Sequence, residues 1–154
     1  MREQSERVRE LAAEIRAEGE RAAADLRRLD EAVVGLRPAP GKWCKKEILG
    51  HLIDSAANNH QRFVRAQFGD PFTFPGYEQE PWVAVHRYRD RSWAELVTVW
   101  NALNLQVAAV VEGVPADRLQ TKCSIGGAEP VSLELLMQDY LRHMRHHLQQ
   151  LERA

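Results

Sequence analysis

Two histidines near the carboxyl end of the chain, His143 and His147, are spaced so that both could bind one metal ion. On a helix, residues four apart project from neighbouring turns of one face, about 40° apart around the axis. A metal that is held firmly and still has open coordination positions needs a third protein ligand. His51, which opens a polar stripe on an upstream segment, is the candidate. His146 lies three residues from His143, so the spacing leaves it open as an alternative to His147.

A site of three neutral imidazoles would leave the full double charge on the ion. Such an ion favours anionic ligands and lowers the pKa of a bound water or thiol toward neutrality. Zinc and nickel both accept imidazole ligands. Residues at helical spacing from the histidines could support the ligands or contact a substrate: Asp54, Asn58, Arg62, Asp139, Arg145 and Gln150. The two arginines among them are candidates for contact with an anionic cosubstrate.

The segments that carry these residues have the periodicity of amphipathic helices. Apolar residues recur every three or four positions in four stretches, and prolines and glycines separate them. Ser92 with Glu95 forms a capping box, and Ser132 is a further helix cap. The pattern predicts an all-α, four-helix bundle with main helices over about 5–34, 44–68, 92–112 and 133–152. A short helix is expected over 80–87, an ordered loop over 69–77, and an irregular connection or small hairpin over 122–130.

Composition indicates one soluble domain spanning residues 1–154. Hydrophobic residues make up 44% and charged residues 28% of the chain, which suffices for a real core. The net charge of -1 disfavours a nucleic-acid partner. We find no apolar stretch of the roughly 20 residues that span a bilayer, and no signal peptide, so we expect a cytoplasmic protein with no membrane partner. Cys44 and Cys123 lack metal-knuckle spacing and are expected to be free thiols.

Three segments of the chain resemble the DinB-like superfamily of small metal-binding helical bundles. They are the segment from Trp43 to Ser55 with its His-x-x-Asp-Ser pattern, the segment from Tyr77 to Trp82, and the run His143-Met144-Arg145-His146-His147. The similarity covers nearly the whole chain and is greatest to the metal-dependent hydrolase branch that includes bacillithiol transferases. It implies an up-down-down-up bundle, often dimeric, in which residues matching His51, His143 and His147 hold a nickel or zinc ion. It also implies a possible low-molecular-weight thiol cosubstrate.

Our first functional hypothesis is a metal-dependent thiol S-transferase that acts on small electrophiles. Zinc peptidase helices place a glutamate between their two histidines as general base, whereas Met144, Arg145 and His146 stand between His143 and His147 here. Peptide hydrolysis is therefore disfavoured. Two alternatives stay open: a hydrolase in which Asp54 or a neighbour activates water, and a non-catalytic metal-binding stress protein. Alanines on the charged face of the first helix would permit close approach of a second copy, so we expect a homodimer.

Overall fold

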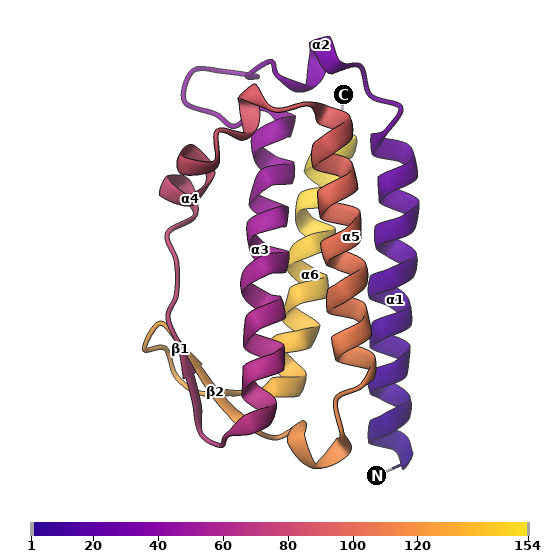
Figure 1. The fold of residues 1–154 in the computed structure, drawn as a ribbon, viewed down its shortest axis with the longest axis vertical. Coiled ribbons are helices and arrows are strands. Elements are labelled where there is room, and N and C mark those ends of the chain that lie inside the picture. Colours follow the sequence, from indigo (N-terminus) through magenta and orange to yellow (C-terminus); the bar gives the residue numbers. More distant parts are fainter. Residues whose placement is uncertain (1, 154) are drawn as a thin grey trace.

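Four long helices lie side by side in the structure, a computed structural model that describes residues 2–153 (Figure 1). They are α1 (Arg2–Leu26), α3 (Lys45–Arg65), α5 (Trp93–Glu112) and α6 (Leu133–Glu152). Helix α1 runs up in the view of Figure 1, α3 and α5 run down, and α6 returns upward. The expected four-helix bundle with up-down-down-up topology is confirmed.

The first helix is shorter than predicted. Helix α1 ends at Leu26, and a separate short helix, α2 (Glu31–Val34), follows a turn, so the prediction of one helix over 5–34 was wrong. Asp30 interrupts the helix because its side chain accepts a hydrogen bond from the backbone N–H of Ala32 at 2.9 Å and so caps α2. The indole N–H of Trp93 donates to the carbonyl of Leu26 at 2.7 Å and fixes the end of α1.

A small three-stranded sheet lies beside the lower end of α3 in the view of Figure 1. Strands β2 (Lys122–Ile125) and β3 (Val131–Ser132) pair antiparallel, which is the small hairpin that the sequence allowed. Strand β1 (Phe72–Phe74) pairs parallel with β2, with Phe72 opposite Cys123. The sequence predicted only a loop at β1, because its partner strand is distant along the chain.

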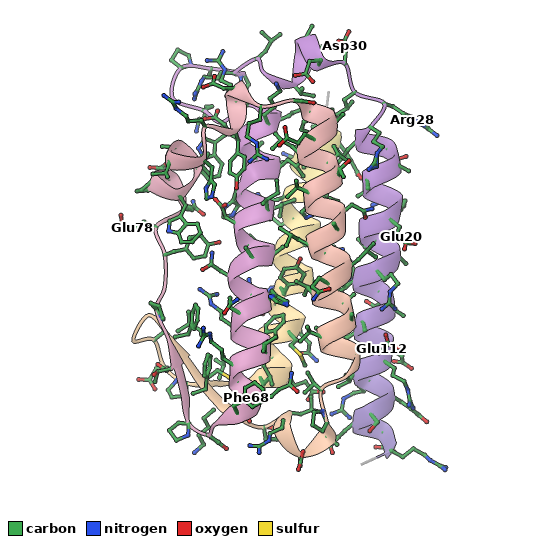
Figure 2. All side chains as sticks on the ribbon, in the orientation of Figure 1. Glu20, Arg28, Asp30, Phe68, Glu78 and Glu112 are labelled. Carbon is green, nitrogen blue, oxygen red and sulfur yellow. The ribbon has the colours of Figure 1, made fainter. Side chains whose placement is uncertain are left out.

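Helices α3 and α5 are parallel neighbours, so the chain between them has to travel back along the bundle. This crossover, residues 66–92, contains a 3-10 turn (Ala66–Phe68), β1, the short helix α4 (Gln79–His86) and a second 3-10 turn (Tyr88–Asp90). A third 3-10 turn (Ala116–Arg118) lies between α5 and β2. The crossover passes alongside α3 (Figure 1), and Glu78, labelled in Figure 2, lies on it. It forms a cover over one face of α3.

Helix α5 is the central helix of the core. It packs against α1 and α3, and Leu96 and Trp100 are fully buried. By length and composition α5 is apolar enough to cross a membrane, so our expectation that no such stretch exists was wrong. The largest apolar side chains of α5, among them Trp93, Leu96 and Trp100, pack in the core of the bundle, while 39% of the apolar window as a whole is buried. Cys44 and Cys123 are free, as expected, and both are buried.

Candidate metal centre

The start of α3 is tied to the end of α6, and this sets the relative height of the histidines. The ammonium of Lys45 donates to the carbonyl oxygens of Leu151 and Arg153, both at 2.6 Å. With a rise of about 1.5 Å per residue, His51 lies about 9 Å along α3 from Lys45, while His147 and His143 lie about 6 and 12 Å back along α6 from Leu151. His51 therefore stands between the levels of the two α6 histidines.

The three rings meet at that level. The Nε2 atoms of His51 and His143 are 3.1 Å apart, and one ligand nitrogen from each of His51, His143 and His147 lies within 4.8 Å of the others. The ring centroid of His51 is 5.0 Å from that of His143 and 4.8 Å from that of His147. The structure thus brings together the three residues that the sequence singled out.

Burial keeps these rings neutral. Burial first, and then the charges of His147 and His143 when they are protonated, lower the pKa of His51 to about 4. The pKa of His143 falls to about 4 for the same reason, with His147 and His146 as the neighbouring charges. Burial also lowers the pKa of His147. Neutral imidazole is the form that binds a metal, so the site is in its ligand state at neutral pH.

The donor set fits a divalent ion. In a tetrahedral site with metal–nitrogen bonds of about 2.0–2.1 Å, neighbouring nitrogens are about 3.3 Å apart, close to the observed His51–His143 separation. Gln150 accepts a hydrogen bond from Nδ1 of His147 at 2.8 Å, which leaves Nε2 of that ring as the ligand atom. Nδ1 of His51 is buried without a hydrogen-bond partner among the described residues. The ring of Trp43 packs beside His51, with centroids 5.4 Å apart.

The ring of His146 lies 4.9 Å from that of His147 but is not part of the triad. Its side chain is exposed and lines a groove between α1 and α6 together with Glu14 and Arg145. Arg145 forms ion pairs with Glu14 at 3.2 Å and Glu18 at 3.7 Å on α1. The geometry therefore favours His147 over His146 as the second ligand from α6, and it places Arg145 away from the triad.

Asp54 belongs to a buried cluster that the sequence analysis did not anticipate. One carboxylate oxygen accepts a hydrogen bond from the hydroxyl of Tyr88 at 2.6 Å and lies 3.4 Å from Nδ1 of His86. The other oxygen, Oδ2, is buried without a partner among the described residues. Burial raises the pKa of the Asp54 carboxyl above its ordinary value, although Tyr88 and His86 act in the opposite direction.

Gly50 makes room for this cluster. A Cβ atom at Gly50 would lie 2.0 Å from a carbon of the Tyr88 ring, so the ring packs directly on the helix backbone. Gly50, four residues before Asp54, is thus the one sequence signal that a side chain packs closely on this part of α3. The sequence does not show that this side chain is Tyr88, because Tyr88 lies in the crossover, far along the chain from Gly50.

The remaining predicted residues have different surroundings. The side-chain amide of Asn58 donates a hydrogen bond to the backbone carbonyl of Asp54 in the same helix at 2.9 Å, and not to a ligand histidine. Asp139 forms an exposed ion pair with Arg142 at 2.6 Å. Arg62 is buried on the stripe of α3 beneath the crossover, with its guanidinium beside the rings of Phe74 and Tyr77. Among residues 2–153, Gln150 is the only predicted supporting residue whose side chain hydrogen-bonds to a triad ring.

The triad opens on two clefts separated by the start of α4. One, of 620 Å³, is lined by His51 and His143 together with Tyr77 and Glu78 from the crossover. The other, of 880 Å³, reaches His147 and is lined by the apolar side chains of Leu36, Trp43 and Ile48 and by basic ones including Lys42 and Arg153. Gln79 and Glu80 border both clefts. Small molecules can therefore approach the triad from either side of α4.

Comparison with known proteins agrees with this architecture. The solved structure of YfiT from Bacillus subtilis, described as a probable metal-dependent hydrolase with an unusual four-helix bundle topology, superposes with a TM-score of 0.78. The two chains are 17% identical, and the match covers 96% of this chain and 83% of that one. No curated protein matches the sequence. The family description that matches, over residues 6–151, is that of the DinB superfamily, and the chain therefore belongs to the DinB superfamily.

Proposed function

We propose that the protein is a divalent-metal-dependent enzyme that transfers a low-molecular-weight thiol to small electrophiles. The observation that carries the proposal is the convergence of three neutral imidazoles, from α3 and α6, at the wall of two clefts. The group contains only histidines, so a divalent ion there would keep its full charge. A bound nickel or zinc ion would lower the pKa of a thiol ligand toward neutrality.

The residues around the triad suit this chemistry. Gln150 fixes the orientation and tautomer of His147, and Trp43 shields one side of His51 from water. The cleft that reaches His147 combines apolar walls with the basic side chains of Lys42 and Arg153. Such a surface fits a molecule with an apolar body and an anionic group.

The proposal is tested by metal analysis and by turnover. Purified protein is analysed for bound metals and assayed for conjugation of small electrophiles with bacillithiol, mycothiol or glutathione. We expect turnover that requires both metal and thiol, and we expect it to be lost in His147→Ala and retained in His146→Ala. The absence of turnover with every thiol, in protein shown to contain metal, would overturn the assignment as a thiol transferase.

A second candidate function, metal-dependent hydrolysis, is favoured by Asp54. Its free oxygen and raised pKa are properties of a general base. Burial, and after it the charge of Asp54, raise the pKa of Tyr77, which lines the first cleft. The description of YfiT as a probable hydrolase supports the same alternative. This function predicts turnover of ester, amide or phosphoester substrates without added thiol, and a large loss of that activity in Asp54→Asn.

Stabilisation by metal without turnover in any assay would instead indicate a non-catalytic metal-binding protein.

A further inference from the structure

Arg62 is a buried cation that the triad does not use. Only 8% of the residue is exposed, and its Nε lacks a hydrogen-bond partner among the described residues. Within residues 2–153 it forms no ion pair with a carboxylate. Its guanidinium lies 5.7 Å from the ring centre of Phe74 and 5.8 Å from that of Tyr77.

Aromatic contacts do not replace a counter-ion. Removing a charge from water is unfavourable unless the charge is paired, and a cation–π contact offsets only part of that cost. Burial accordingly lowers the pKa of Arg62, but arginine stays charged in proteins. Arg62 is therefore charged, has no acidic partner and lies beside two aromatic rings, which are the features of an anion-binding residue. Its planar guanidinium also matches the geometry of a carboxylate or phosphate.

The position of Arg62 relates it to the triad. It follows His51 by about three helical turns and so lies on the same face of α3, about 16 Å further along the axis. Tyr77 connects the two places, because it lines the cleft at His51 and His143 and also lies beside Arg62. Burial raises the pKa of Tyr77, the charge of Asp54 raises it further and the charge of Arg62 lowers it, so both charges act on the Tyr77 hydroxyl.

We propose that Arg62 anchors an oxyanion-binding subsite that holds the anionic end of an elongated substrate or cosubstrate. Its role as a subsite of the enzyme rests on the proposed function, while anion binding itself does not. Because side chains of a helix lean toward its start, the gap between the guanidinium and the triad is on the order of 10 Å, about the length of three extended residues. A substrate that reaches both ends is therefore an elongated carboxylate or phosphate compound.

Inorganic sulfate is the probe for the anion site. The thermal midpoint of the full chain is measured in sulfate and in chloride at equal ionic strength, with metal bound and after chelation, for wild type, Arg62→Met and Arg65→Met. Arg65 is the matched control because it is exposed and bonded to Gln61 in its own helix. Any general stabilisation by sulfate is common to all three proteins.

We expect sulfate at tenfold its dissociation constant to raise the midpoint of wild type and Arg65→Met by about 3 to 6 °C more than that of Arg62→Met, with or without metal. In chloride, Arg62→Met should be at least as stable as wild type, because a buried unpaired charge is removed. The proposal is overturned if Arg62→Met responds to sulfate as wild type does, or if it is destabilised in chloride, which would indicate a purely structural role.

A second measurement addresses the substrate class. With any anionic substrate that the metal-loaded enzyme turns over, Arg62→Met should raise KM at least tenfold and change kcat little, and the difference should vanish when the anionic group of the substrate is esterified. An equal rise in KM for both forms of the substrate would contradict the subsite role. Failure of the proposed function would instead abolish turnover and leave the sulfate response unchanged.

Discussion

Gly50→Ala should destabilise the protein through Tyr88, and the structure gives the size of the effect. The added methyl group would lie 2.0 Å from Cδ2 and 2.3 Å from Cγ of Tyr88, whereas ordinary contacts begin at 3.4 Å. The ring is 1% exposed, so it has no solvent-facing space into which it can retreat easily. Overpacking of this kind costs about 1–3 kcal/mol.

Two further contributions determine the net value. If the ring moves, the buried hydrogen bond from Tyr88 to Asp54 is lost, at a cost of about 1–3 kcal/mol. Alanine is favoured over glycine within a helix by about 1 kcal/mol, which offsets part of this. The free energy of unfolding of Gly50→Ala should therefore fall by about 2–4 kcal/mol.

The assay is urea unfolding at pH 7 with three comparisons. Gly35→Ala is the control, because nothing lies within 4 Å of the Cβ position there, and it should change the free energy of unfolding by less than about 0.5 kcal/mol. Tyr88→Phe measures the hydrogen bond alone. In a Tyr88→Ala background, Gly50→Ala should cost nothing further. A stability of Gly50→Ala equal to wild type would refute the reasoning.

Three other perturbations test the centre and the core. His147→Ala should abolish the rise in thermal midpoint on adding nickel or zinc, while His146→Ala should keep it. Asp54→Asn should raise the free energy of unfolding at pH 7, because the raised pKa of Asp54 shows that folding disfavours its charged form. This gain in stability should shrink as the pH falls through the pKa of Asp54 in the folded state, because the carboxyl then becomes neutral. Asn104→Ala should lower the free energy of unfolding by about 2–3 kcal/mol in urea, because the buried hydroxyl of Tyr140 loses its acceptor.

Each of these predictions has an outcome that contradicts it. If the metal response disappears in His146→Ala and persists in His147→Ala, His146 rather than His147 is the metal ligand. For Asp54→Asn, a gain that grows as the pH falls would mean that the pKa is lowered rather than raised. For Asn104→Ala, a loss below about 0.5 kcal/mol would show that water or a side-chain rearrangement satisfies Tyr140.

The helices and the histidines could be predicted from the sequence because both depend on local spacing. The four-residue interval between His143 and His147 fixes their common face, and the polar stripe of α3 identifies His51. The break after Leu26 was missed because apolar periodicity continues through it, while the cap at Asp30 depends on one side chain.

The crossover could not be predicted in the same way. Its path depends on the pairing of Phe72 with Cys123 and on the packing of Tyr88 against Gly50, and these are contacts between residues far apart in the sequence. The cluster around Asp54 was missed for this reason. The bond from Lys45 to the end of α6, which sets the histidines at one level, is likewise a long-range contact.

The parallel course of α3 and α5 has a consequence for how such a protein can diversify. The three histidine rings belong to two core helices, whereas much of the wall of the cleft beside His51 and His143 belongs to the segment between α3 and α5. Substitutions in this segment can therefore change the shape of the cleft while the histidines stay in place. Descendants of one ancestral bundle could in this way acquire unrelated substrates without rebuilding the scaffold.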